Sequence, residues 1–425
     1  MAFSPGGQRI ATGVAGFDGT VEFWSVGLPP QLTAQQMGRC GNVPIALLAI
    51  RAKPRQGSAN PMVSTKQDWN LGIALADGGR PCYPGLDGLR ALAIILVFGA
   101  HAQIGGFGCG FVGVDVFFVL SGFLIGGIVL DQLRDGRFRY GEYVKRRAVR
   151  ILPPLACLLA GAAAVQLLAN PAPWPRGIFW RSWLHGAAFT SNWYVFHGGG
   201  DACLSHLWSL STEAQFYLGF PLLLGLAYRC RFLGGFFLGV AALVLFQSAL
   251  LHWVFTGGHT RWAHGLNAWV LTRPEGWLLG ALCAYGVRVL PMRHLGPVPT
   301  SVGVTLLAAL ALWSKADWRT AVGCTSVQWA TVLVLMLSVK APGSGLVRVL
   351  EWAPLRWVGR YSYGLYLWHL FVLQWVYGWG LPGWAWEPVS LGLAILLAVF
   401  TDRGGGRVGS QGGLRPAAAL LDRGQ

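Results

Sequence analysis

The chain carries little charge, and few of its charged residues are acidic. Only 12% of its 425 residues are charged, and 33 Lys and Arg residues face 17 Asp and Glu residues. Soluble domains carry about 25% charged residues, whereas 54% of this chain is hydrophobic. The composition therefore indicates a protein that crosses a membrane several times. The basic residues lie in short loops between apolar segments, where the positive-inside rule places them, so we expect no nucleic-acid partner.

Cysteine motifs and a signal peptide are also lacking. The eight cysteines are scattered without a C-x-x-C pair, so the sequence indicates neither a zinc site nor a disulfide scaffold, and we expect no metal. Cys109 and Cys203 are expected on the same outer side of the membrane and could pair. The first 30 residues lack a basic segment followed by an apolar one, so the first membrane helix is expected to act as the insertion signal.

The two ends of the chain differ from the part between them. Residues 1–85 are polar, Gly/Pro-rich and without a spanning segment, and 2–26 resembles one WD40 propeller blade with strands around Asp18-Gly19. A single blade cannot bury its own faces. We therefore favour a vestigial or wrongly assigned N-terminus, with translation starting near Met62, over a docking element. Residues 402–425 form a Gly/Arg-rich tail that we expect to be disordered.

The segment 86–401 predicts an all-α integral membrane bundle of about ten transmembrane helices. The expected helices cover 86–106, 111–130, 149–169, 206–227, 232–253, 267–288, 299–314, 325–339, 358–379 and 385–401. Most Lys and Arg residues fall at alternate helix ends on one side, including the run from Arg134 to Arg150, so both termini are expected to be cytoplasmic. The Trp-rich segment 170–205 then lies outside, as an interfacial or re-entrant piece.

The first helix contains three ionisable residues, Asp87, Arg90 and His101. Arg90 and His101 are eleven residues apart, which places them on one helix face about 16 Å apart, with Asp87 on the same stripe. Ionisable groups inside a membrane are costly and usually mark a functional pathway. The alternative is that Arg90 reaches to the interface and His101 makes a packing contact.

Other ionisable or polar residues lie in or next to the later helices. Asp115 opens the second helix, and the Ser121-Gly122 pair is typical of close helix approach. Glu213 follows His206 by two turns, on the same face. The remaining candidates for a polar interior are Arg273, Glu275, Arg360, Tyr363, Tyr366 and His369. Arg146, Arg147 and Arg150 would suit bidentate contacts to phosphate.

Five motifs in order resemble those of bacterial acyltransferase family 3, the integral-membrane O-acyltransferases that include O-antigen and exopolysaccharide acetylases. They are D-G-L-R-A-L-A with Arg90 and His101 at the R-x10-H spacing, F-F-V-L-S-G-F (117–123), R-R-x-x-R-I-x-P (146–153), H-x-W-S-L-x-x-E-x-Q-F-Y (206–217) and Y-S-Y-x-L-Y-L-W-H (361–369). The chain departs from the family where Ala214 follows Glu213 in place of a second acidic residue, and in its tail. No large esterase-like segment follows, so we expect a stand-alone transferase.

The resemblance implies transfer of an acyl group, commonly acetyl, from cytoplasmic acyl-CoA to a hydroxyl of an envelope glycan or glycolipid, in the bacterial inner membrane. Acyl-CoA would be a cosubstrate, and no tightly bound cofactor is expected. We expect Arg90, Arg146, Arg147 and Arg150 to hold the phosphates of CoA. His101 would be the general base, oriented by Glu213 or Asp115. The acceptor would be bound by the following residues: His206, Trp208, Arg273, Glu275, Tyr363 and His369.

Three alternatives remain open from the sequence. His101 or Ser121 could carry the acyl group covalently. The chain could instead be a transporter or flippase for a glycan or lipid, which also needs ionisable residues at depth, although the two halves show no internal repeat. It could also be a degenerate relative that binds CoA without transferring the acyl group.

Overall fold

The computed structural model describes the residues 85–108, 110–169, 173–199, 203–256, 274–289, 321–340 and 343–409, together with seven short strands. The chain divides into two compact units, Met1–Gln67 and Asp68–Gln425. The first unit therefore ends before the boundary at residue 85 that composition suggested. The start-site question at Met62 and the tail beyond Gly409 lie outside the described residues.

The first unit contains two small antiparallel sheets. Strands β1 (Ala2–Phe3), β2 (Arg9–Ala11) and β5 (Val26–Gly27) form one sheet in the order β1-β2-β5. Strands β3 (Gly13–Ala15) and β4 (Val21–Phe23) form the other, with Gly13 opposite Phe23. This is the strand pair that we expected around Asp18-Gly19.

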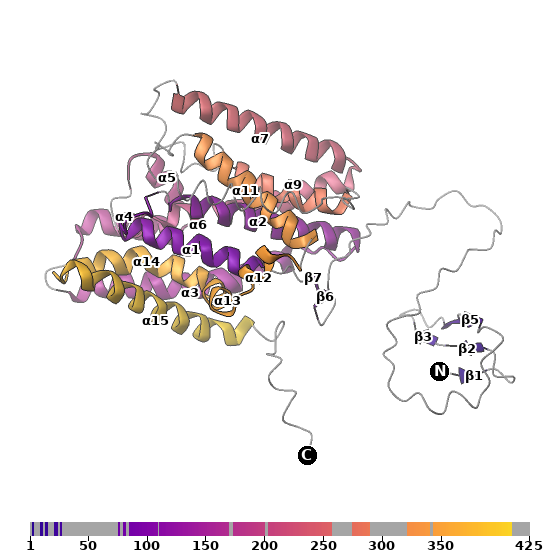
Figure 1. Cartoon of the computed structure of the whole chain (residues 1–425), viewed down its shortest axis with the longest axis horizontal. Coiled ribbons are helices and arrows are strands. Elements are labelled where there is room, and N and C mark those ends of the chain that lie inside the picture. Colours follow the sequence, from indigo (N-terminus) through magenta and orange to yellow (C-terminus); the bar gives the residue numbers. More distant parts are fainter. Residues whose placement is uncertain are drawn as a thin grey trace, which may run out of the picture. The chain divides into compact units, whose positions relative to one another are not determined.

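The second unit starts with the short pair β6 (Leu75–Ala76) and β7 (Arg80–Pro81), and its described residues from 85 to 409 form only helices and turns. Its helices, in chain order, are α1 (Leu86–His101), α2 (Val112–Arg134), α3 (Tyr140–Leu168), α4 (Arg176–Ala187), α5 (Ser191–Phe196), α6 (Leu207–Arg229), α7 (Leu233–Thr256), α9 (Glu275–Val289), α11 (Ala321–Lys340), α12 (Gly345–Leu350), α13 (Ala353–Arg360), α14 (Ser362–Tyr377) and α15 (Gly383–Gly409). Figure 1 shows α1 and α2 in the middle, with α7, α9 and α11 on one side and α14 and α15 on the other.

Four of the described helices are long and apolar enough to cross a membrane: α2, α3, and the segments Leu233–Leu250 of α7 and Trp384–Asp402 of α15. Large apolar side chains on α7 are exposed, with Leu238 at 72% and Leu245 at 64%, while Phe237 and Val240 are buried on its other side. A helix that is apolar all round suits a membrane, where its exposed face meets lipid. The described residues from 85 to 409 therefore form an all-helical bundle of the kind found in membrane proteins.

Several helix boundaries differ from the expected ones. Helix α3 begins at Tyr140 rather than 149, because the basic segment before the apolar run is itself helical, with Glu142 in the first turn. Such an acidic residue stabilises a helix N-terminus. The segment expected as 358–379 is split at Tyr361 into α13 and α14, and α15 continues to Gly409, past 401. The helix expected at 299–314 lies outside the described residues.

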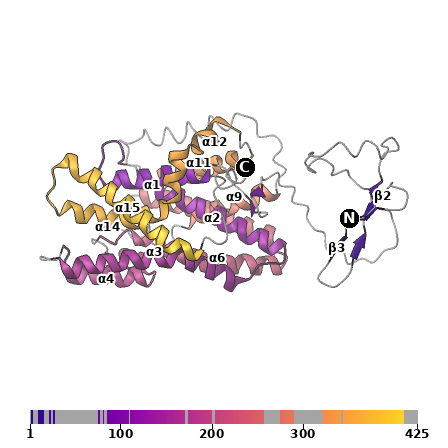
Figure 2. The ribbon, with the colours of Figure 1, turned by 90° about the horizontal axis from the view of Figure 1, so that it is seen from below.

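The Trp-rich segment forms α4 and α5, and α4 packs on α3 and α6 (Figure 2). The Trp183 indole N–H donates to the backbone oxygen of Leu159 at 2.9 Å, and the Gln166 amide donates to the oxygen of Trp174 at 2.8 Å. These bonds fix the segment to α3. The expectation of an interfacial or re-entrant piece remains a prediction, since it depends on where the bilayer lies.

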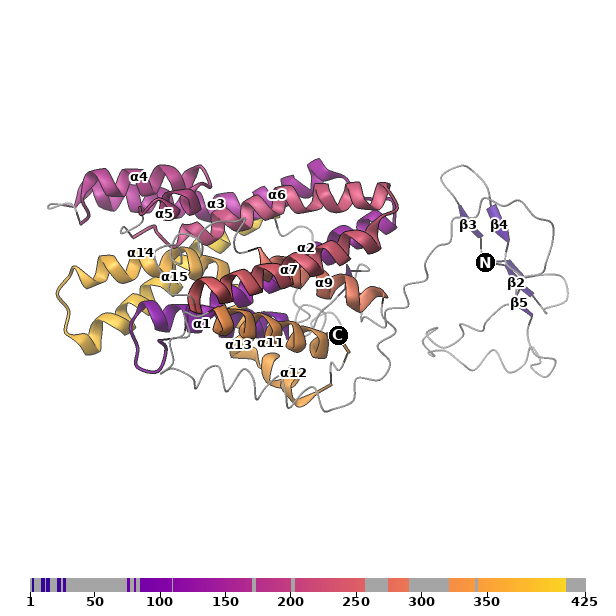
Figure 3. The same cartoon turned by 90° about the horizontal axis from the view of Figure 1, so that it is seen from above.

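Helices α2 and α9 make the most extensive helix–helix contact among the described residues, and Figure 3 shows them side by side. A Cβ atom on Gly122 would lie 2.0 Å from the backbone oxygen of Trp277, and one on Gly280 would lie 2.1 Å from that of Val119. The two backbones therefore touch, as the Ser121-Gly122 pair predicted. Small residues at membrane helix crossings permit this approach.

We expect Gly122→Ala to push α2 and α9 apart and to lower the free energy of unfolding by about 1–3 kcal/mol, the usual cost of overpacking. The measurement is the apparent Tm of detergent-solubilised protein, followed by size-exclusion chromatography. Gly239→Ala on α7 is the matched control, because no atom lies within 4 Å of the added Cβ. A Gly122→Ala protein as stable as the Gly239→Ala protein would contradict the close contact.

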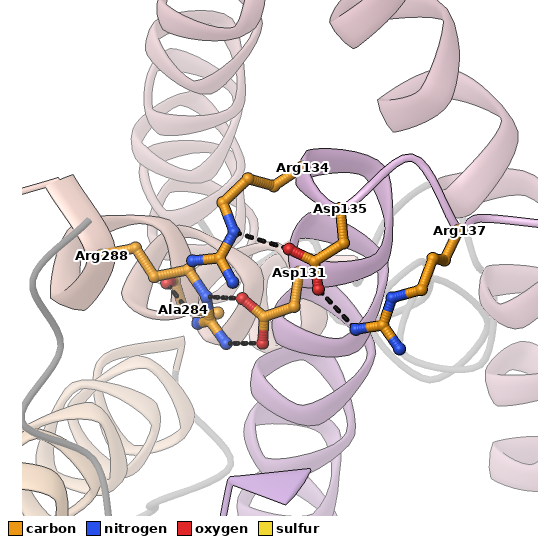
Figure 4. Close-up of polar contacts among 6 residues, drawn as sticks. All are labelled: Asp131, Arg134, Asp135, Arg137, Ala284 and Arg288. Carbon is orange, nitrogen blue, oxygen red and sulfur yellow. Dashed lines mark hydrogen bonds and ion pairs between the residues drawn. The ribbon is translucent and has the colours of Figure 1, made fainter. Parts of the chain in front are cut away.

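A buried ion pair closes the far end of the same crossing (Figure 4). Arg288 on α9 donates from Nε and Nη2 to the two carboxylate oxygens of Asp131 on α2, at 2.8 and 2.7 Å. The Arg288 side chain is 1% exposed. Gly127 makes room for it, since a Cβ there would lie 2.8 Å from the guanidinium.

Candidate functional site

The polar stripe of α1 has a different partner at each end. At one end Arg90 Nη1 donates to Asp87 Oδ1 at 3.0 Å, one turn along the helix. At the other end His101 is the last helical residue, and its Nδ1 lies 2.9 Å from the backbone oxygen of Val97. Asp87 therefore serves as the counter-ion of Arg90. We call the two ends of the bundle the Arg90 end and the His101 end.

A cavity of about 100 Å³ lies between the two ends, and we call it the arginine pocket. Three guanidinium groups line it, those of Arg90, Arg147 and Arg150, from α1 and α3. Its other polar lining comes from α2, α6 and α14: Ser121, Ser209, Glu213, Tyr217, Ser362, Tyr363 and Tyr366. The pocket therefore presents an excess of positive charge to whatever occupies it, and it suits an anionic group.

Glu213 is held by two hydroxyl groups inside this pocket. Ser121 Oγ and Tyr217 OH both donate to Glu213 Oε1. Arg147 lies over the rings of Tyr143 and Tyr217, 5.7 and 5.6 Å from their centroids, in cation–π geometry. The Ser121–Glu213 contact has the form of a nucleophile beside a base, so the arrangement is compatible with an acyl-enzyme on Ser121.

Neither carboxylate that we expected to orient His101 contacts it. Glu213 is engaged by Ser121 and Tyr217, and Asp115 Oδ1 accepts from the Gln328 amide at 2.9 Å. Asp115 faces α11 because it sits on the buried side of α2, where it is 2% exposed. In the described structure the contacts of His101 are a backbone carbonyl and aromatic rings, and an orienting role for either acid stays a prediction.

Three histidines meet at the His101 end, and we call them the histidine cluster: His101, His206 and His369. They come from α1, the N-cap of α6 and α14. The ring centroids of His101 and His369 are 5.0 Å apart, and those of His206 and His369 are 5.1 Å apart. His206 and His369 are buried, whereas His101 is half-buried, so the cluster opens on the side of His101.

Backbone carbonyls fix the tautomer of each imidazole. The carbonyls of Val97, Leu367 and Tyr366 can only accept, so they take the N–H of His101 Nδ1, His206 Nε2 and His369 Nδ1 respectively. In the neutral rings, the opposite nitrogens then carry lone pairs. His206 Nδ1 and His369 Nε2 are buried, and neither has a hydrogen-bond partner among the described residues. The cluster therefore offers acceptors suited to hydroxyl groups.

Tyr366 lies between the arginine pocket and the histidine cluster. It lines the pocket, and its ring centroid is 5.6 Å from that of His206 and 5.3 Å from that of His369. Its hydroxyl donates to the backbone oxygen of His206 at 3.0 Å and is hydrogen-bonded to Ser209. From the sequence, Tyr366 was expected only as one of several residues of a polar interior, one turn before His369.

Arg146 is the one expected phosphate ligand that the described pocket does not include. It is exposed, and its Nε donates to the backbone oxygen of Glu142 at 3.2 Å. Helical periodicity alone does not explain this, because Arg150 lies about 40° from Arg146 and about 60° from Arg147 around the helix. What distinguishes Arg147 is its contact with the ring of Tyr217 on α6, whereas Arg146 is bonded to its own helix. The pocket therefore includes two of the three neighbouring arginines, and phosphate binding by them stays a prediction.

The other expected acceptor ligands are spread over the bundle. Tyr363 lines the arginine pocket and donates to the backbone oxygen of Ile151 at 3.0 Å. Trp208 packs edge-to-face on Phe118, with centroids 6.1 Å apart. Glu275 is fully buried at the start of α9, and Arg273 lies outside the described residues. Among the described members of this set, His206 and His369 are the two that form a cluster with His101.

The described residues contain neither a metal site nor the expected disulfide partner of Cys203. Within the described ranges, no three His, Cys, Asp or Glu side chains are arranged to hold a metal ion. Cys203 is buried with a free thiol, and Cys109 lies outside the described residues.

Comparison with known proteins identifies relatives of the membrane unit. The family described as "Acyltransferase domain" (acyltransferase family 3) matches residues 83–402. The chain is 31% identical over 323 residues to the "Putative peptidoglycan O-acetyltransferase YrhL" of Bacillus subtilis, covering 68% of this chain and 48% of that protein. It is 28% identical over 316 residues to the "O-acetyltransferase OatA" of Staphylococcus aureus, covering 69% of this chain and 51% of that protein. The chain thus spans about half the length of these relatives. No solved structure matches it.

Proposed function

The chain belongs to acyltransferase family 3, and from this premise we propose that it is a membrane O-acetyltransferase that uses acyl-CoA. The acceptor is a hydroxyl of an envelope glycan or glycolipid. Two relatives are named as O-acetyltransferases, one of them of peptidoglycan, which supports this class of acceptor.

The proposed topology has ten membrane helices, both termini in the cytoplasm and the bundle in the cytoplasmic membrane. The charge distribution supports it, because the basic segment from Arg134 to Arg150, which includes the first turns of α3, adjoins the Arg90 end. The Arg90 end is then cytoplasmic, where acyl-CoA is available, and the His101 end faces outward. The four described spanning helices are compatible with this topology.

At the Arg90 end, the arginine pocket holds the donor. Guanidinium groups form charge-assisted, bidentate contacts with phosphate, and Arg90, Arg147 and Arg150 converge on one cavity. Asp87 keeps the Arg90 side chain oriented through its 3.0 Å ion pair. Phosphates bound here leave the pantetheine arm to reach toward the His101 end, about 16 Å along α1.

At the His101 end, the histidine cluster handles the acceptor and its proton. His101 donates from Nδ1 to the Val97 carbonyl, which leaves Nε2 as the base. The acceptor oxygen attacks the thioester carbonyl while its proton passes to His101 Nε2. The carbon–sulfur bond then breaks, and the CoA sulfur takes the proton from His101. His206 Nδ1 and His369 Nε2 are placed to accept hydrogen bonds from neighbouring hydroxyls.

The observation that carries the proposal is the order of these groups along the bundle. A pocket lined by three arginines lies on one side of Tyr366, and three imidazoles lie on the other, two of which have a buried nitrogen without a partner among the described residues. Anion binding and proton removal are the two tasks that transfer from acyl-CoA to a hydroxyl requires. A transporter needs neither at such close range.

The direct test is to incubate the purified protein with radiolabelled acetyl-CoA and extracted envelope glycan. Label that moves to the glycan in an alkali-labile form supports the enzyme. Binding of CoA without transfer supports a degenerate relative, and glycan movement across vesicles without acylation supports a transporter.

We expect Arg150→Ala to raise KM for acetyl-CoA about tenfold or more while kcat changes little, because a hydrogen bond to a charged group contributes about 1.5–3 kcal/mol. Arg146→Ala is the matched control on the same helix, since Arg146 is exposed and does not line the pocket. Steady-state kinetics with varied acetyl-CoA measure both. Equal KM values for the two variants would contradict the assignment of the pocket to the donor.

A further inference from the structure

The arginine pocket stops one layer of side chains short of the histidine cluster. On α14, Ser362, Tyr363 and Tyr366 line the pocket, and His369 follows Tyr366 by three residues, about 4.5 Å of rise. On α6, Ser209 lines the pocket, and His206 precedes it by the same interval. Neither His101 nor the other two histidines line the pocket.

The ring of Tyr366 fills this layer and is held in place from both sides. Its hydroxyl donates to the His206 carbonyl at 3.0 Å and is hydrogen-bonded to Ser209, so α6 fixes the tip of the side chain. Phe117 on α2 packs edge-to-face against the ring, with centroids 6.2 Å apart, and also lines the pocket. The far face of Tyr366 contacts His206 and His369.

This arrangement separates groups that must meet during acyl transfer. The acceptor oxygen and the thioester carbon have to approach to about 3–3.5 Å. If the donor is held by the arginines and the acceptor by the histidines, the Tyr366 ring stands between them. The ring must therefore move for each turnover, and in its observed position His101 cannot act on a thioester in the pocket.

We propose that Tyr366 is a gate that decides between the acceptor hydroxyl and water. While it is closed, the ring keeps the thioester away from His101 and from the water that can reach this half-buried histidine. It opens when the acceptor occupies the histidine cluster, where the hydroxyls of the acceptor replace the contacts that hold the ring. The inference rests on the proposed function, and it adds a role for Tyr366 in suppressing hydrolysis.

When the gate is open and no acceptor is bound, water can hydrolyse acetyl-CoA. The oxygen of water attacks the thioester carbonyl, and its proton passes to His101. The carbon–sulfur bond breaks, which releases acetate and the CoA thiol, with no acceptor consumed. Hydrolysis without acceptor therefore measures how often the gate is open, and transfer to glycan measures the productive reaction.

The test compares the wild-type protein with Tyr366→Phe and Tyr366→Ala, purified in detergent and incubated with acetyl-CoA with and without envelope glycan. CoA thiol release and acetylated glycan are measured together. Tyr366→Phe keeps the ring but loses both hydrogen bonds at its tip, and we expect the ratio of hydrolysis to transfer to rise about tenfold or more. Tyr366→Ala removes the ring and should raise the ratio further.

Tyr377→Phe is the control, because Tyr377 lies on the same helix and is 71% exposed; it should leave the ratio unchanged. Folding of each variant is checked by size-exclusion chromatography, and Tyr366→Phe is nearly isosteric with the wild type. An unchanged ratio in Tyr366→Phe and Tyr366→Ala would overturn the gate. So would folded variants that bind acetyl-CoA but lose hydrolysis and transfer together. A wild-type protein that never acetylates glycan would instead overturn the proposed function.

Discussion

His101→Ala is expected to lower kcat for acetyl transfer by about 10²–10⁴-fold, the range that a positioned general base contributes. The structure gives His101 what this role needs: its Nδ1 bonds to the Val97 carbonyl, so the Nε2 lone pair is available, and the ring is half-buried. KM for acetyl-CoA should change little, because His101 does not line the arginine pocket. The measurement is steady-state transfer of radiolabelled acetyl to envelope glycan.

His197→Ala is the matched control for this experiment. The Nδ1 of His197 also bonds to the backbone oxygen four residues earlier, that of Trp193 at 2.8 Å, but the ring lies outside the histidine cluster. Its replacement removes the same kind of local contact and should leave kcat within about twofold. A folded His101→Ala protein with full activity would contradict the assignment of the base.

Part of this site could be predicted from the periodicity of single helices. The eleven residues between Arg90 and His101 predicted one polar stripe on α1, and the structure adds that Asp87 pairs with Arg90 at 3.0 Å. The Ser121-Gly122 pair predicted a close crossing, which proved to be with α9. Periodicity predicts which residues share one face of a helix, and both the polar stripe of α1 and the small-residue face of α2 are properties of a single helix.

What the sequence could not supply is which faces meet. His101, His206 and His369 were separate candidates, and their ring contacts depend on the packing of α1, α6 and α14. Glu213 shares a helix with His206, yet its partners are Ser121 on α2 and Tyr217 on its own helix. These contacts join residues far apart in the sequence, so no local pattern indicates them.

Arg146 shows the same limit. The basic segment was interpreted as a loop before a helix at 149, whereas α3 begins at Tyr140. On this helix Arg150 lies about 40° from Arg146 and about 60° from Arg147, so periodicity does not choose between the two neighbours. The choice depends on the packing of α3 against α6, where Arg147 meets the ring of Tyr217. Membrane hydropathy locates the part of a helix inside the bilayer and misses its extension into water.

The second large effect is expected from the Arg288–Asp131 pair, where Arg288→Met should lower the free energy of unfolding by about 3–5 kcal/mol. The change leaves the Asp131 carboxylate without its partner, and the Asp131 side chain is only 24% exposed. Both of its hydrogen bonds in the described structure come from Arg288. Asp131 also lies in the last turn of α2, where a negative charge is unfavourable to the helix dipole. Reversible unfolding in mixed micelles measures the loss.

Two comparisons separate the buried pair from charge in general. Arg137→Met removes an exposed partner of Asp135, and exposed pairs contribute about 0–1 kcal/mol to the free energy of unfolding. The hydrogen bond from Arg137 is the main reason that the pKa of Asp135 lies below its usual value. Arg288→Met combined with Asp131→Leu should recover most of the stability, because replacing both charges avoids the stranded carboxylate. If the double variant is as unstable as Arg288→Met, the loss comes from packing around Gly127 rather than from the unpaired charge.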